Sequence, residues 1–199
     1  MKKFLGGIAG VAFLLAFACA PRANADSVTL QLSQCNTTGL CNVGHIDLTT
    51  VGSGSSEEIQ VTVTMDAGFG VFGNGAGNGA IGFNGTGLSG IDSTSLPSGF
   101  SVGSGGEFDG FGNFAFSLTG PVAAHAVSSF TFDITCTGGC TSVSQVTDFS
   151  VHVRNNSTGL TGFDETNGGP GETPEPSSLL LMGSGLLGLA AAARRRLLA

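Results

Sequence analysis

The chain has 199 residues, of which seven are basic and fourteen acidic, and it contains 34 glycines and 15 phenylalanines but no tryptophan or tyrosine. Between Asp26 and Thr173 the chain contains one arginine and thirteen acidic residues, which gives a formal charge of −12. Such a segment offers no cationic patch to a phosphate backbone, so its charge excludes nucleic-acid binding and disfavours anionic lipid surfaces.

The N-terminus predicts a secretory signal peptide that occupies the first 25 residues. The basic pair Lys2–Lys3 precedes an apolar core from Phe4 to Ala18. Ala23 and Ala25 then place small residues at the cleavage positions. We therefore expect an exported protein whose mature chain begins at Asp26.

Residues 26–163 alternate apolar and polar side chains and show no helical periodicity, which predicts β-strands with one buried face. The apolar members of five predicted strands are Val28, Leu30 and Leu32; Ile59, Val61, Val63 and Met65; Phe114, Phe116 and Leu118; Phe130, Phe132 and Ile134; and Phe149, Val151 and Val153. Their polar neighbours are mostly Thr, Ser and Gln, which is typical of an antiparallel sheet with one solvated face.

The predicted fold is a mainly β domain over 26–163, an antiparallel β-sandwich or jelly-roll-like domain with glycine-rich loops. Its length of about 138 residues is enough for one hydrophobic core. Residues 164–172 are rich in Asn, Gly, Pro and acids, and they predict a flexible linker.

Four cysteines follow the signal peptide, at positions 35, 41, 136 and 140. An even number in an exported chain favours two disulfides, most simply Cys35–Cys41 and Cys136–Cys140, although four cysteines allow three pairings. The alternative is a zinc site that these cysteines form with His45. Their spacings lack the usual Cys-x-x-Cys form, which disfavours zinc.

Two motifs suggest catalysis, but neither has the secondary structure that it needs. Residues 68–73 match G-x-G-x-x-G, yet the glycine-rich segment that follows cannot form the helix of a dinucleotide site. Residues 99–103 match G-x-S-x-G, with Ser101 as nucleophile and His125 or His152 as base, and they too lack a following helix. His125 is expected in a loop, and His152, which alternates with valines, is expected to face solvent. We expect no enzymatic activity and no cofactor.

A loop containing Glu107, Asp109 and Asn113 gathers oxygen ligands of the kind that calcium prefers. It matches neither an EF-hand nor a calcium nonapeptide repeat. Solvated loop acids and a calcium site both remain open at this point.

The C-terminus combines a short rigid motif, an apolar segment and a basic stop. Pro174 and Pro176 flank Glu175 and hold the chain extended. Residues 177–193 carry no charge and, as a helix, would span roughly 26 Å, at the short end for crossing a bilayer. The triplet Arg194, Arg195 and Arg196 then predicts a stop-transfer signal on the cytoplasmic side.

This arrangement over 173–196 resembles the PEP-CTERM sorting signal, a family also catalogued as the ice-binding protein C-terminal domain. The family's Pro-Glu-Pro corresponds to Pro174, Glu175 and Pro176. The body has no Thr-x-Thr ladder along the sequence beyond the single pair Thr62 and Thr64, so the ice-related label refers to the tail alone.

The resemblance implies processing by an exosortase, a membrane-embedded cysteine transpeptidase of Gram-negative bacteria that make exopolysaccharide and biofilm matrix. It therefore predicts a non-enzymatic protein that is transiently anchored in the inner membrane and then delivered to the cell envelope or matrix. The alternative is a carbohydrate- or calcium-binding module, which would show acids and exposed aromatic side chains on one face.

Overall fold

The computed structural model describes residues 26–73 and 79–167. The signal-peptide residues Ala23 and Ala25 and the whole predicted sorting signal over 173–196 lie outside these ranges. Asp26, the expected first residue of the mature chain, is already tied to the domain, because its carbonyl oxygen accepts a hydrogen bond from the backbone N–H of Thr50. Within the described ranges, none of the helices has the length and apolar character required to cross a bilayer.

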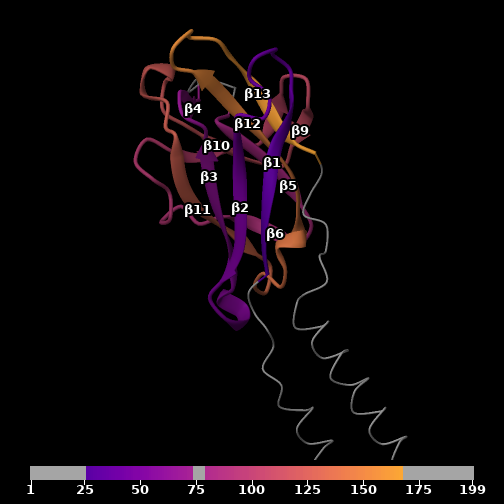
Figure 1. Cartoon of the computed structure of the whole chain (residues 1–199). Coiled ribbons are helices and arrows are strands. Elements are labelled where there is room, and N and C mark those ends of the chain that lie inside the picture. Colours follow the sequence, from indigo (N-terminus) through magenta and orange to yellow (C-terminus); the bar gives the residue numbers. More distant parts are fainter. Residues whose placement is uncertain (1–25, 74–78, 168–199) are drawn as a thin grey trace, which may run out of the picture.

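The described residues form thirteen strands and three short 3₁₀-helices (Figure 1). The strands are β1 (Ser27–Cys35), β2 (Gly44–Val51), β3 (Glu58–Met65), β4 (Phe69–Val71), β5 (Ile81–Gly85), β6 (Leu88–Ile91), β7 (Ser101–Gly103), β8 (Gly106–Phe108), β9 (Gly112–Phe114), β10 (Phe116–Thr119), β11 (Ser129–Cys136), β12 (Val146–Asn155) and β13 (Thr161–Thr166). The 3₁₀-helices are η1 (Gly54–Ser56), η2 (Ala123–His125) and η3 (Val143–Gln145).

Eleven of the strands belong to one antiparallel sheet in the order β6-β11-β3-β2-β1-β13-β12-β5-β10-β7, with β4 beside β12. Strand β1 links the two halves of this sheet: Ser27–Gln31 pair with β2, whereas Leu32–Cys35 pair with β13, with an irregularity in register between Leu32 and Gln34. The predicted antiparallel β-fold is confirmed, but one continuous sheet curls nearly closed where two separate sheets were expected. We call β6, β11, β3, β2 and β1 the first half-sheet. The second half-sheet consists of β13, β12, β4, β5, β10 and β7.

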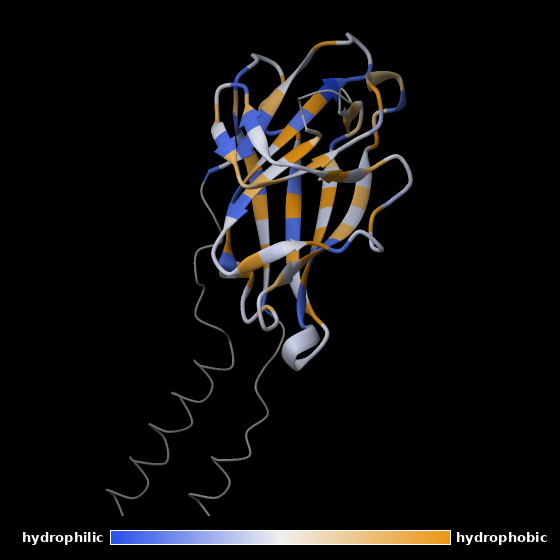
Figure 2. Ribbon diagram, turned by 180° about the vertical axis from the view of Figure 1, so that it is seen from behind, coloured by the Kyte–Doolittle hydropathy of each residue, from blue (hydrophilic) through white to orange (hydrophobic). Residues whose placement is uncertain are grey.

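The hydrophobic core lies between the two half-sheets and is built by strict alternation along the strands. In β3, every second side chain from Ile59 to Met65 is buried, and the side chains between them are half-buried. Figure 2 shows the same alternation of apolar and polar positions along neighbouring strands. Phe83 joins the two half-sheets, because its ring packs against Phe132 of β11 and Phe149 of β12. Each such buried side chain contributes about 1.5–3 kcal/mol of hydrophobic stabilisation.

A second, smaller cluster lies on the outer face of the second half-sheet. It contains the rings of Phe108, Phe114 and Phe163, with Phe111 packed against them. Strands β8 and β9, which pair only with each other among the described strands, place these rings over the sheet as a hairpin.

Phe114, Phe116 and Leu118 were expected on one strand, and this prediction is wrong. Phe114 ends β9 and joins the small cluster, whereas Phe116 begins β10 and packs on the main core. Alternation along the sequence cannot distinguish one strand from two strands that serve different cores.

The domain also extends beyond the predicted boundary at Phe163. Strand β13 continues to Thr166, and Asp164 and Thr166 are buried. The hydroxyl of Thr166 accepts a hydrogen bond from the backbone N–H of Phe149 at 3.0 Å. The first three residues assigned to the flexible linker are therefore part of the folded sheet.

Candidate functional site

Strand pairing brings twelve polar side chains together on the outer face of the first half-sheet, and we call this surface the polar face. It consists of three rows that each take one residue from β1, β2, β3 and β11. The rows are Gln31, His45, Thr64 and Ser129; Thr29, Asp47, Thr62 and Thr131; and Ser27, Thr49, Gln60 and Asp133. All twelve side chains are half-buried or exposed, and none is aliphatic or is a phenylalanine, tyrosine or tryptophan.

The polar face is hollowed between β1 and β2. This hollow has a volume of about 270 Å³, and its polar lining includes Ser27, Thr29, Asp47 and Thr49. The hydroxyl of Thr29 donates a hydrogen bond to Oδ1 of Asp47, and Nε2 of His45 lies 3.6 Å from Oδ2 of the same carboxylate. The carboxylate is thus fixed at the hollow by neighbours on both sides of it.

A group of three carboxylates adjoins one edge of the polar face. Oxygens of Glu58, Asp92 and Asp133 lie within 4.8 Å of one another. Burial, with the added repulsion of Asp133 and Asp92, raises the pKa of Glu58. Hydrogen bonds from the backbone and side chain of Thr94 lower the pKa of Asp92. Hard cations such as calcium prefer oxygen ligands of this kind, so these three residues could hold such an ion.

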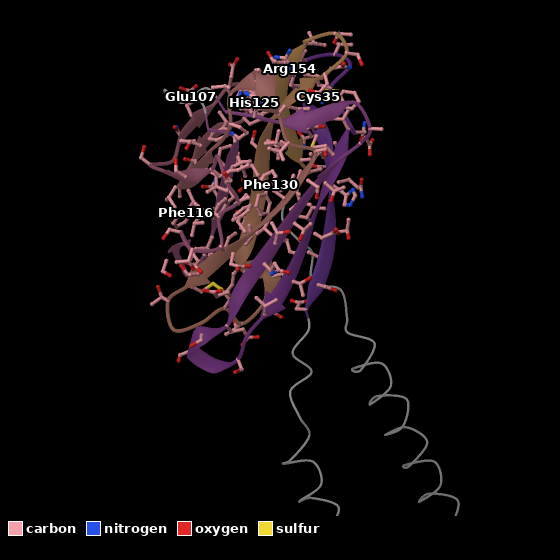
Figure 3. All side chains as sticks on the ribbon, turned by 90° about the vertical axis from the view of Figure 1, so that its left-hand side faces the viewer. Cys35, Glu107, Phe116, His125, Phe130 and Arg154 are labelled. Atoms are coloured by element: carbon pink, nitrogen blue, oxygen red, sulfur yellow. A yellow bond between two sulfur atoms is a disulfide. The ribbon has the colours of Figure 1, made fainter. Side chains whose placement is uncertain are left out.

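The predicted calcium loop has a different geometry. Glu107 and Asn113 face each other across the β8–β9 hairpin, and Glu107 lies on the side of the domain away from β1 to β3 (Figure 3). The carbonyl oxygen of Asp109 accepts a hydrogen bond from Nδ2 of Asn36 at 2.8 Å. Among the described residues, the carboxylates that converge in a group of three are those near β3 and β11, and they do not include Glu107 or Asp109.

Both predicted disulfides are present. Cys35 bonds to Cys41 and Cys136 to Cys140, with Cα atoms 5.0 Å and 4.9 Å apart respectively. The alternative zinc site is wrong, because every sulfur that it requires is bonded to another sulfur. His45, its predicted fifth member, belongs to the polar face.

The residues of the predicted nucleophile motif are not brought together. Ser101 lies on the edge strand β7, and its hydroxyl is hydrogen-bonded to that of Thr119 at 2.6 Å. His125 is exposed in η2. In the described part of the chain, no hydrogen bond joins Ser101 to a histidine. Two glycines of the G-x-G-x-x-G match instead allow close packing: a methyl carbon would lie 3.0 Å from the β-carbon of Ala126 at Gly70 and 2.5 Å from the backbone nitrogen of Gly120 at Gly73.

His152 does not face solvent, and that prediction is wrong. Its ring lies between Phe72 and Phe163, at centroid distances of 3.9 Å and 4.2 Å, and the residue is 5% exposed. Its Nδ1 atom has no hydrogen-bond partner, and burial lowers its pKa to about 4. The alternation correctly predicts that the His152 side chain lies on the outer face of β12, but this face is covered at that point.

Two acidic residues of β13, Asp164 and Glu165, also have shifted pKa values. Burial raises the pKa of Asp164 to about 6, although backbone N–H groups of Val43, Glu165 and Asn42 partly oppose this effect. Neither oxygen of the Asp164 carboxylate makes a hydrogen bond of good geometry. Burial and the nearby Asp148 raise the pKa of Glu165 to about 7.

Comparison with protein families finds one match, which lies outside the folded body. Residues 172–196 match the PEP-CTERM protein-sorting motif. The chain therefore carries a PEP-CTERM sorting signal, which exosortase recognises during export to the envelope of Gram-negative bacteria. No curated protein and no solved structure matches this chain.

Proposed function

We propose that this protein is a non-enzymatic component of the cell envelope or extracellular matrix that exosortase processes and that associates with exopolysaccharide. The observation that carries the proposal is the sorting motif at 172–196, which follows the last strand residue, Thr166, after a short spacer. A folded domain followed by a sorting signal supports the proposal, because this order suits processing of the tail while the domain is outside the membrane.

The body has properties that suit this destination. Two disulfides favour an oxidising compartment, because cytosolic thiols are kept reduced. A single arginine among the described residues and the excess of acids keep the domain soluble and repel other acidic polymers.

The second candidate is a carbohydrate- or calcium-binding module displayed at the surface. The polar face favours it, because acids, amides and hydroxyls converge there on one side of the sheet. The exposed aromatic side chains that commonly stack on sugars are missing from its twelve positions. Any glycan on this face would therefore be held by hydrogen bonds and charge.

Mass spectrometry of the mature C-terminus, from native cells, tests the processing. We expect a terminus near Pro174–Pro176 and loss of Arg194–Arg196. A Glu175→Gln variant should retain the full tail and stay with the membrane fraction, whereas Glu107→Gln, which makes the same charge change on the β8–β9 hairpin, should be processed normally. An intact tail on the wild-type protein would contradict the proposal.

A further inference from the structure

We propose that the polar face binds a polysaccharide of amino sugars, whose ammonium group is held by the Asp47 carboxylate in the hollow between β1 and β2. This inference names the ligand class of the matrix association and rests on the proposed function.

The hollow has the size and the lining for one sugar unit. Its volume of about 270 Å³ lies near the lower end of small-molecule sites. The hydroxyls of Ser27, Thr29 and Thr49 can each donate and accept hydrogen bonds, as sugar hydroxyls do. Asp47 supplies acceptors only, and hydrogen bonds between charged partners are roughly twice as strong as neutral ones.

Charge selects the kind of sugar. The face carries Asp47 and Asp133, and His45 is its one cationic candidate, 3.6 Å from Asp47. The described residues contain one lysine or arginine side chain, Arg154, which lies on β12 of the second half-sheet near one end of the domain (Figure 3). The two carboxylates would repel uronic acids and sulfated sugars, whereas they would attract an ammonium group.

The remaining rows extend the site across the sheet. Four strands at about 4.8 Å spacing give a surface about 14 Å wide, enough for a short stretch of glycan. Thr62 and Thr131 in the same row as Asp47 offer further hydroxyls, and Gln60 beside Asp133 offers an amide. Because the face has no phenylalanine, tyrosine or tryptophan side chain, the attraction is mainly electrostatic and should weaken as salt is added.

Isothermal titration of the full-length protein in neutral detergent tests this inference with two matched probes at pH 6. A glucosamine hexamer carries ammonium groups, and an N-acetylglucosamine hexamer has the same backbone with neutral amides. We expect the glucosamine hexamer to bind at least tenfold more tightly at low salt, and its affinity to fall as the salt concentration rises. Equal affinity for the two probes, or no binding of either, would overturn the inference.

Two isosteric variants separate the site from the overall charge of the domain. Asp47→Asn should weaken binding of the glucosamine hexamer about tenfold, because one charge-assisted hydrogen bond is lost. Asp109→Asn makes the same change of net charge on the β8–β9 hairpin. With both variants compared at about 0.1 M salt, it should leave the affinity within about twofold of wild type, since exposed charges beyond about 10 Å are largely screened at that ionic strength. Equal losses in both variants, or no loss in Asp47→Asn with an unchanged thermal unfolding midpoint, would overturn the inference.

The inference and the proposed function fail in different ways. A correctly processed C-terminus without glucosamine binding overturns only the inference about the polar face. Binding by a protein whose native tail is intact overturns only the exosortase processing.

Discussion

Thr62 and Thr131 lie directly opposite each other on β3 and β11, with their hydroxyl oxygens 3.1 Å apart. The two residues are 69 positions apart in the chain. Their neighbours along the same strands, Thr64 opposite Ser129 and Gln60 opposite Asp133, continue the pairing. The polar face is therefore a product of pairing between distant strands.

A double-mutant cycle should measure a small coupling between these threonines. Thr62→Val and Thr131→Val keep a β-branched shape but remove the hydroxyls, so each single variant leaves one hydroxyl without its partner. We expect a favourable coupling of about 0.5 kcal/mol from urea unfolding, within the range of cross-strand pairs. A coupling indistinguishable from zero would mean that the hydroxyl pair does not stabilise the sheet.

His152 should make the domain less stable in acid. Its folded-state pKa of about 4 lies below the ordinary value of 6.5, so the unfolded chain binds a proton first as the pH falls. Stability is then lost between pH 6.5 and 4, by up to about 3 kcal/mol. His152→Phe, which keeps an aromatic ring between Phe72 and Phe163, should remove this loss.

The free energy of unfolding of His152→Phe must be compared with that of wild type as a difference at each pH. Asp164 and Glu165 have raised pKa values and act in the opposite direction, because their stabilising protonated forms are lost as the pH rises through about 6 and 7. Those contributions cancel in the difference. His125→Gln removes an exposed histidine, so its free energy of unfolding should depend on pH as that of wild type does. The same pH dependence in His152→Phe would contradict the burial of His152.

The two disulfides should differ in their effect on stability. Closing loops this short contributes about 2 kcal/mol for each bridge. Cys140 is fully buried and Cys136 nearly so, whereas Cys41 is exposed. Replacing the Cys136–Cys140 pair by alanine should therefore cost more in chemical unfolding than replacing the Cys35–Cys41 pair. Equal losses would indicate that packing of the sulfurs in the core adds nothing.

Gly82 should be essential to the packing of the β8–β9 hairpin. A methyl carbon there would lie 2.7 Å from Cε2 of Phe108 and 2.8 Å from Cγ of Phe114. Gly82→Ala should destabilise the domain by about 1–3 kcal/mol and speed amide hydrogen exchange in the hairpin. Adding Phe108→Leu makes room for the methyl group, so the double variant should lose less than the sum of the single changes. Strict additivity would contradict direct contact.

Much of the fold was accessible from local pattern. Alternation located β1, β3, β11 and β12, and cysteine spacing located both disulfides. Strand β2 was missed, although Ile46, Leu48 and Thr50 alternate with polar residues, and this signal was available. The covered surroundings of His152 gave no comparable signal, because Phe72, one of the two rings that cover it, lies 80 positions earlier in the chain.

The sequence by itself determined the acidic charge, the β-periodicity and the sorting motif, since each of these depends on neighbouring residues or on composition. Only the tertiary structure decided that the threonines at positions 29, 62 and 131 share a row with Asp47, that a hollow opens beside this carboxylate, and that His152 lies between two rings. The physical reason is that strand order follows from burying one common core. Every pairing depends on the whole set of strands, and the sequence around a single residue does not contain that information.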